Sequence, residues 1–346
     1  MVSLYDTRTL QSVISGLDRP QMFLTEVFFP SIVNFDTDTI EFDKLDRALG
    51  LAPFCSPLVQ GTPVRAKGYQ TDTFTPAYMK LKNEVGLNRP LKRRHGERFG
   101  GDQSPNARRD QVLVEIVQEQ YFKALRRKEW MASAALRTGS VIVEGEDYPR
   151  QSVDFGRDPA HTVTLTGAAR WGEAGVSPLD DIQAWSDLVA DSSGAAANVV
   201  VMHPTAWAYA RRDPQIDKIL DHRYVRPTQV ELGPLSRGEG RWGTYVGSVG
   251  QFDFWTYTQP YDTPGGVRES FMPANTVIIA APGEDAGVAG YQAHGAIKDP
   301  SAGYQPVEIY SKNWIEQDPA VEWVMSQSAP LMVPARPNAS FCATVR

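Results

Sequence analysis

Apolar side chains recur at helical spacing through residues 106–138, a stretch that contains no proline or glycine. The positions that would share one face of a helix are Val114, Val117, Tyr121, Leu125, Met131, Ala132 and Ala135. Asn106 is a suitable N-cap, and Gly139 suits the left-handed residue that ends a helix. At 1.5 Å per residue, this helix would be about 50 Å long. We therefore predict a spine helix that lies across a sheet-rich body rather than in a helix bundle.

Alternating apolar and polar residues predict strands on the N-terminal side of this helix. The apolar residues at inward positions of a first strand pair are Phe35, Ile40, Phe42 and Leu45. Residues 64–76 and 77–85 alternate in the same way, and they predict a long two-stranded ribbon with a basic tip at 92–101. An isolated ribbon is only marginally stable in water. We expect this one to lie against another surface, most simply that of another subunit.

On the C-terminal side of the helix, residues 140–156 predict a hairpin. Ser177 followed by Pro178 is typical of a helix N-terminus and predicts a helix through Val189. A short buried strand follows at 196–204. This change of pattern predicts a second, αβ domain.

The remaining sequence alternates between a polar segment and strands. Residues 223–245 are polar and glycine-rich, which predicts a long loop of unassigned role. From Tyr245 onwards the chain is β-rich, with a turn at 262–266 between two strands.

The composition is that of a globular protein with enough core for two domains, because 42% of its 346 residues are hydrophobic. No run of eighteen apolar residues and no signal-peptide pattern occurs, so we expect neither a membrane span nor a signal peptide. We predict that Cys55 and Cys342 are buried free thiols; a disulfide is the alternative. The net charge of −6 argues against a dedicated nucleic-acid binder.

The charge is distributed unevenly along the chain. Residues 1–64 carry 4 basic and 8 acidic side chains, whereas residues 65–109 carry 11 basic and 4 acidic ones. Two such surfaces predict complementary partners, for example each other across subunits. The alternative is that both faces are solvated and have no partner.

No pattern of catalytic, metal-binding or cofactor-binding residues stands out. The five histidines are isolated in sequence: His95, His161, His203, His222 and His294. We interpret His203, which lies between a strand and Pro204, as a hydrogen-bonded turn residue. Asp180 and Asp181 are better explained as acids at a helix N-terminus than as a catalytic pair. We therefore predict no enzyme, no cofactor and no metal.

Two long blocks resemble the lambda-type major capsid protein E family. The first is 56–85, with the core F-T-P-x-Y-x-K at Phe74 to Lys80, and the second is YSKNWIEQDPAVEWVMSQSAPLMV at 310–333. Between them, SPLDDIQAW and VVVMHPTAWAYARR resemble further family segments in the same order. The resemblance covers essentially the whole chain.

The resemblance implies an α+β fold, the tailed-phage capsid fold of the Hong Kong 97 type. Its expected parts are an N-terminal arm at 1–35, a peripheral-domain strand at 36–49, an extended β-hairpin loop at 50–104, a peripheral domain with the spine helix and a β-hairpin at 105–169, an axial αβ domain at 170–309, and C-terminal strands at 310–346 that return to the peripheral and axial domains.

The same resemblance implies a structural role. Hexamers and pentamers would tile an icosahedral head shell around double-stranded DNA, contacted non-specifically. A scaffolding protein, a portal and a trimeric decoration protein would be partners, and no membrane would be. Assembly would occur in the host cytoplasm and end in the virion capsid. Alternatives are the shell of a cellular nanocompartment and a soluble β-rich enzyme or carbohydrate-binding protein.

Several apolar or basic residues are candidates for contacts between subunits. They are Phe23, Phe28, Phe29, Phe74, Thr75, Pro76, Tyr78, Lys80, Lys82, Lys92, Arg93, Arg94, Arg126 and Arg127. The two arginines, with Lys128, would contact either a neighbour's loop or arm, or packaged DNA. Some relatives cross-link through a lysine of the extended loop, but we expect no such isopeptide bond here.

Overall fold

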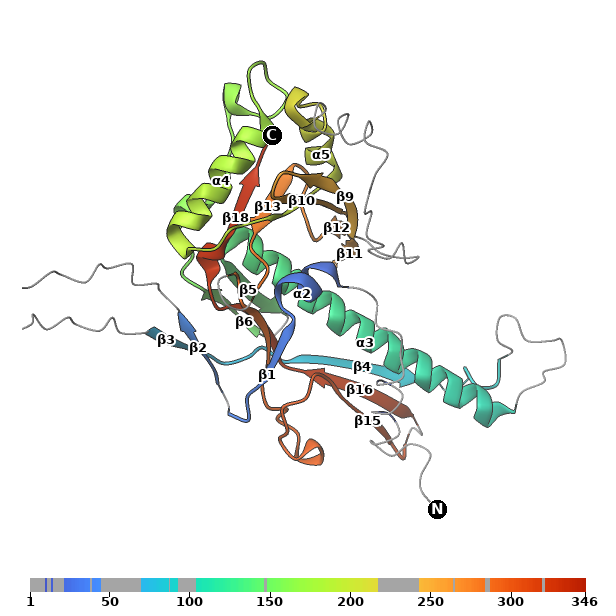
Figure 1. The fold of residues 1–346 in the computed structure, drawn as a ribbon. Coiled ribbons are helices and arrows are strands. Elements are labelled where there is room, and N and C mark those ends of the chain that lie inside the picture. The colour runs from blue at the N-terminus through green and yellow to red at the C-terminus, as the bar shows by residue number, and fades with distance from the viewer. Residues whose placement is uncertain are drawn as a thin grey trace, which may run out of the picture. The chain divides into compact units, whose positions relative to one another are not determined.

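The computed structural model describes residues 10, 14, 22–37, 39–44, 70–86, 88–92, 104–145, 148–216, 243–263, 265–283, 287–318 and 321–346. Figure 1 shows their helices and strands as a ribbon. These residues fall into two units. The first unit comprises Met1–Ile40, Thr75–Ser133 and Tyr291–Met332, and the second comprises Glu41–Phe74, Ala134–Gly290 and Val333–Arg346. Residues 93–101 of the expected tip at 92–101, Cys55 and most of the 223–245 segment lie outside the described residues.

The predicted spine helix is α3, Pro105–Thr138. It begins one residue earlier than expected, because Ser104 is the cap: its Oγ accepts a hydrogen bond from the Ala107 N–H at 3.2 Å. Pro105 then occupies the first turn, where its missing N–H costs no hydrogen bond. Most of the predicted stripe is buried, but Val114 is 38% exposed. The first half of α3 buries Val117 as predicted, together with Val112, Leu113 and Ile116, which were not part of the predicted stripe.

The strands of the first unit form two three-stranded sheets. One has the order β15-β16-β4, with β15 at Tyr310–Ile315, β16 at Glu322–Ser328 and β4 at Met79–Val85. The other has the order β1-β14-β17, formed by Ser31–Asn34, Gly290–His294 and Pro330–Pro334. Before β1 lies a short helix, α2, at Phe23–Phe28.

The predicted ribbon between residues 64–76 and 77–85 is wrong. β4 pairs in antiparallel fashion with β16, with Lys82 opposite Met325. β3, Gln70–Phe74, pairs instead with β2, Ile40–Lys44, in a separate two-stranded sheet. Alternation of apolar and polar residues shows that a strand has two different faces, but it does not determine which strand pairs with it. β4 pairs with β16 because it can then cover the apolar side of α3.

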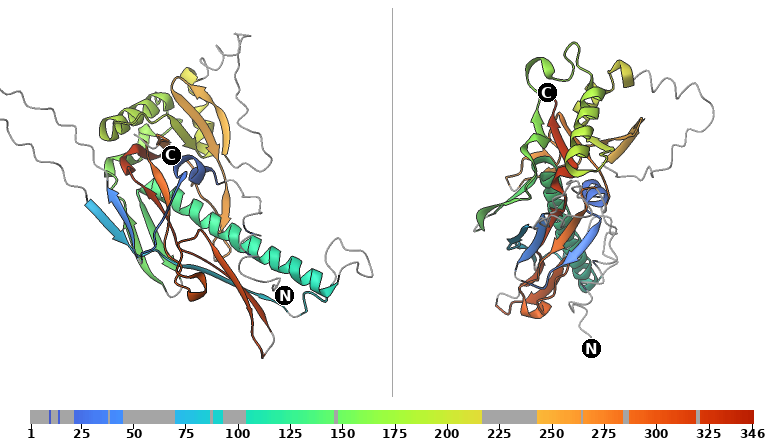
Figure 2. Two further views of the ribbon diagram at one scale, coloured as in Figure 1. Left: turned by 60° about the horizontal axis from the view of Figure 1, so that its bottom comes forward. Right: turned by 60° about the vertical axis from the view of Figure 1, so that its left-hand side comes forward.

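The second unit is built on a six-stranded sheet of order β7-β18-β13-β8-β10-β9. Figure 2 shows the ribbon from two further sides. The strands are Thr162–Thr164, Ser340–Thr344, Thr276–Ala280, Val199–Met202, Phe252–Tyr257 and Gly243–Val249. Helix α4, Pro178–Ser193, packs on it through Ile182, Trp185 and Val189, and a second helix, α5, follows β8 at Pro204–Ala210. The predicted buried strand and helix are therefore confirmed.

The second unit also contains two hairpins, and both follow the sequence prediction. β5, Ser140–Gly145, pairs with β6, Tyr148–Asp154. β11, Pro260–Asp262, pairs with β12, Arg268–Ser270, across the predicted turn. Short 3₁₀ helices occur at Pro159–His161, Gly167–Ala169, Pro300–Ala302 and Pro337–Ala339.

Cys342 is a buried free thiol on β18, as predicted. Burial raises the pKa of this thiol to about 11, because the apolar surroundings disfavour the thiolate. It is therefore a core residue with low reactivity.

The C-terminal end of α3 is closed by Gly139 and Arg157. Gly139 has φ +68°, the left-handed conformation that glycine adopts most easily. The guanidinium of Arg157 donates to the carbonyl oxygens of Leu136, at 2.6 Å, and Arg137, which no longer have partners within the helix. A Cβ on residue 139 would approach the Arg157 Cβ to 2.5 Å. Any other residue at this position would therefore displace Arg157.

We predict that Gly139→Ala lowers the free energy of unfolding of the unassembled subunit by about 2 to 4 kcal/mol, through left-handed strain and displacement of Arg157. Urea unfolding followed by circular dichroism measures this. Gly167→Ala is the matched control, because Gly167 also has a positive φ (+59°) but has open space around it. Equal losses in the two variants would show that Arg157 does not contribute.

Candidate interaction surfaces

One face of the β15-β16-β4 sheet carries lysine beside tryptophan. The Lys82 Nζ lies 3.8 Å from the ring centroid of Trp323 and 5.2 Å from that of Trp314. Trp314 and Trp323 are opposite each other in the β15–β16 register. Such cation–π contacts hold an exposed lysine with about 0.5 to 1 kcal/mol each. The result is an ordered cationic and aromatic surface that includes β4, a strand expected to belong to the extended β-hairpin loop.

The opposite face of this sheet packs on α3 through polar contacts. Gln120 of α3 is buried, and its Nε2 donates to Asn83 Oδ1 at 2.8 Å. Its Oε1 accepts from the Ser326 hydroxyl at 2.5 Å. Because each of these buried polar groups has a partner, the sheet and helix have one defined register.

Two consecutive charged residues of α3, Lys128 and Glu129, are buried. The Glu129 carboxylate accepts hydrogen bonds from the N–H groups of Leu24 and Thr25, at 2.8 and 3.0 Å, and from the Thr25 hydroxyl at 2.6 Å. These two N–H groups belong to the first turn of α2, which has no side-chain cap of its own. Glu129 therefore fastens the N-terminal segment to the spine helix.

Lys128 is paired inside the first unit. Its Nζ donates to Glu308 Oε1 at 2.6 Å and to Gln292 Oε1 at 3.0 Å, and Gln292 in turn donates to the Phe29 carbonyl at 3.0 Å. The expectation that Lys128 contacts a neighbour or DNA is therefore wrong. Burying a cation is costly unless other groups compensate its charge, and here the compensating carboxylate comes from a distant part of the chain.

His294 lies beside this pair and is buried, with neither ring nitrogen hydrogen-bonded within the described residues. Burial and the nearby positive charge of Lys128 lower its pKa to about 4, against a smaller opposite effect of Glu308. The imidazole is therefore neutral at neutral pH.

The aromatic candidates of the N-terminal arm are used inside the chain. Phe28 and Phe29 are fully buried, and Phe23 is half-buried on α2. The rings of Phe28 and Phe29 are therefore unavailable for contacts between subunits, because they are buried in the core of the first unit.

The F-T-P-x-Y-x-K segment also splits between the interior and the surface. Pro76 is buried against Gly295, whose missing side chain makes room for it. The Tyr78 hydroxyl donates to the Ala296 carbonyl. Phe74 is half-buried and Thr75 is exposed. Pro76 and Tyr78 therefore help to hold the fold together.

The basic candidates are the ones that remain on the surface. Lys80, Lys82 and Lys92 are exposed, as are Arg126 and Arg127 of α3. The Arg127 guanidinium lies 5.2 Å from the Trp130 ring centroid. Arg93 and Arg94 lie outside the described residues.

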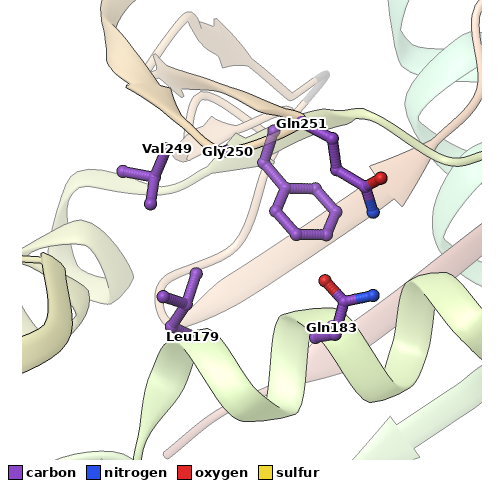
Figure 3. A pocket seen from close by; sticks show the side chains of 6 residues that line it. Leu179, Gln183, Val249, Gly250 and Gln251 are labelled. Atoms are coloured by element: carbon purple, nitrogen blue, oxygen red, sulfur yellow. The ribbon is translucent and has the colours of Figure 1, made fainter. Parts of the chain in front are cut away.

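A shallow hollow of about 350 Å³ opens in the second unit, between the start of α4 and the β9–β10 turn (Figure 3). Leu179, Val249 and Phe252 give it an apolar lining, and Gln183 and Gln251 lie at its edge. No group of histidine, cysteine, aspartate or glutamate side chains in the described ranges could hold a metal ion. Within the same ranges, every helix is too short or too polar to cross a membrane.

Sequence reasoning missed the buried charges of α3, although one signal was present. Lys128 lies seven residues after Tyr121 and four before Ala132, so helical spacing puts it on the apolar face. A lysine on such a face predicts a carboxylate partner. No sequence signal identifies that partner as Glu308, which is 180 residues away.

Known proteins resemble this chain along its whole length. A model of the family described as phage major capsid protein E matches residues 6–345. The major capsid protein of Escherichia phage lambda is 28% identical over 344 residues, covering 97% of this chain and 98% of the relative, and that of Escherichia phage N15 matches equally well. The crystal structure of a prophage capsid protein from Escherichia coli CFT073 superposes with a TM-score of 0.72 at 24% identity, over 98% of this chain and 99% of that one.

We predict that Glu129→Gln loosens the N-terminal segment. A glutamine places an NH₂ group against one of the two α2 N–H groups, so the variant should lose about 1 to 3 kcal/mol of protection from hydrogen exchange at Leu24 and Thr25. Glu119→Gln is the control, since Glu119 is exposed and pairs with Lys123 of the next turn. Unchanged exchange at both amides would contradict the role of Glu129.

We predict that stability falls as the pH is lowered from about 6.5 to about 4. His294 has a folded pKa of about 4 and an ordinary unfolded pKa near 6.5, so the unfolded chain binds the proton first in this interval. The contribution of the neutral His294 to the free energy of unfolding is complete above pH 6.5 and is lost as the pH falls towards 4. Urea unfolding of wild type and His294→Asn across this range measures it; equal slopes in the two proteins would refute the assignment.

Proposed function

This chain belongs to the phage major capsid protein E family, and we propose that its copies associate as hexamers and pentamers that tile an icosahedral head shell around double-stranded DNA. It is a major capsid protein of tailed phages, so it is a structural component of the virion capsid that associates with itself. The observation that carries the proposal is the family match from residue 6 to residue 345, which spans both units of the structure.

The surfaces support assembly through strands and charges. The β2–β3 pair is a two-stranded sheet, which is too small to be stable alone and gains by lying on a neighbour. The exposed lysines beside tryptophans on β4 and β16 offer an ordered surface for an acidic partner. In the proposed shell, Lys80, Lys82 and Lys92 contact neighbouring copies, with burial between subunits adding stability to each.

The parts of the subunit follow the family with one change. We keep the arm at 1–35, the axial domain at 170–309 and the C-terminal strands at 310–346 as proposals. The extended loop is narrowed to the segment between β2 and β3, because β4 belongs to the sheet that covers α3.

Further partners rest on the family resemblance and on charge. Arg126 and Arg127 are exposed cations on α3 that would neutralise phosphates of packaged DNA without reading its sequence. A scaffolding protein, a portal and a trimeric decoration protein complete the proposed assembly, which takes place in the host cytoplasm. The nanocompartment and the β-rich enzyme are disfavoured, because the relatives matched along their whole length are phage major capsid proteins.

Electron microscopy of the full chain, expressed with and without the other head proteins of its phage, tests this function. Shells or capsomer rings are the expected result. A single small, featureless species under all conditions would overturn the proposal.

We predict that Lys92→Glu/Arg93→Glu/Arg94→Glu reduces shell formation by about tenfold or more and changes its dependence on salt, because the basic segment meets acidic surface of another copy. Particle yield by sedimentation across salt concentrations is the measurement. Lys123→Glu is the control, since this exposed lysine pairs within its own helix. Wild-type assembly by the triple variant at every salt concentration would contradict the prediction.

A further inference from the structure

Helix α4 presents one side to solvent that nothing in the described chain covers. Its exposed residues recur at helical spacing: Asp180, Gln183, Ala184, Asp187, Leu188 and Asp191. The buried side, with Ile182, Trp185 and Val189, holds the helix on the sheet. The exposed side is therefore rigidly presented.

This side of α4 is acidic, and no cation in the described part of the chain neutralises it. The helix contains no lysine or arginine. Asp187 accepts a hydrogen bond from Gln183 at 2.9 Å, and Asp180 accepts from Gln215 at 3.2 Å, so both carboxylates have neutral amides as partners. In the described residues, no cation pairs with Asp180, Asp187 or Asp191. Their negative charge is available to a partner.

The apolar hollow is continuous with this acidic side through Gln183. Gln183 lines the hollow (Figure 3). Its side-chain amide also donates a hydrogen bond to Asp187. Leu179, one turn earlier, forms its apolar wall opposite Val249. Leu188, further along the same side of α4, is 36% exposed. A fitting partner would be a basic segment with an apolar residue at one end.

The chain contains such a segment at 91–99, LKRRHGERF. Four cations, Lys92, Arg93, Arg94 and Arg98, lie between the apolar residues Leu91 and Phe99. Leu91 is 68% exposed, so its side chain has no place in the core of its own chain. The order of apolar and basic residues matches the hollow and the acidic side of α4.

We propose that the exposed side of α4 and the adjoining hollow form a docking surface for residues 91–99 of a second copy. This rests on the proposed function, since only an assembling chain supplies a second copy at high local concentration. In this contact, Leu91 or Phe99 occupies the hollow. The cations of the basic segment lie along Asp180, Asp187 and Asp191.

Photo-crosslinking tests the contact directly. A photoreactive phenylalanine analogue replaces Leu91 in unlabelled chains, which are co-assembled with ¹⁵N-labelled wild-type chains. After irradiation, mass spectrometry should find adducts to heavy peptides from α4 or the β9–β10 turn. Adducts only to light peptides, which would indicate contact within one chain, or adducts elsewhere, would overturn the proposal.

Charge exchange provides a second, independent test. Asp187→Lys/Asp191→Lys should lower particle yield by about tenfold or more, and adding Lys92→Glu/Arg93→Glu in the same chain should restore most of it. Glu173→Lys/Asp318→Lys is the matched control, because both carboxylates are exposed and neither has a cationic partner among the described residues. Equal losses in the control, or no rescue by the exchange, would contradict the docking surface.

The outcomes separate this inference from the proposed function. If wild-type chains form no particles with their head proteins, the proposed function fails. If they form particles that show neither the heavy adducts nor the rescue, only the docking surface fails. Asp187→Asn/Asp191→Asn is the variant to use if the lysine variant does not fold. It should form particles at low salt concentration, but its particles should dissociate at a lower salt concentration than those of wild type. An unchanged salt profile would count against the proposal.

Discussion

The first unit depends on burying one side of α3. This helix places apolar residues such as Ile116, Val117 and Tyr121 under strands that come from distant parts of the chain. The helix alone could not supply this stability, because helical propensity contributes little compared with packing of an amphipathic face. Strand β4 is therefore used as a cover for α3 rather than as half of a free ribbon, and this choice leaves β3 to pair with β2.

Buried charge gives that packing its specificity. Lys128 and Glu129 lie next to each other on α3, yet they bind different parts of the chain. Lys128 joins Glu308 and Gln292, whereas Glu129 fixes the first turn of α2. An apolar pair could fill the same space, but it would not define the position of the N-terminal segment in the same way. In a capsid subunit that associates with copies of itself, these contacts hold the N-terminal segment in one arrangement.

The candidate site could be predicted only in part. Charge counting along the sequence singled out the basic segment, and the structure shows Lys80, Lys82 and Lys92 exposed. Aromatic content was a poor guide, because Phe28 and Phe29 are core residues whereas Trp323 is only half-buried, beside Lys82. An aromatic side chain suits both environments, so its type does not distinguish them.

The sequence by itself determined the local elements. Ser177 with Pro178 begins α4, Gly139 ends α3, and the order of motifs identifies the capsid family, because each depends on residues close together in the chain. Only the tertiary structure decided which strand pairs with β4, and that Lys128 is buried while Arg127 is exposed. The reason is physical: capping and turns are satisfied locally, whereas strand partners and the burial of a charge depend on what distant residues can cover or neutralise.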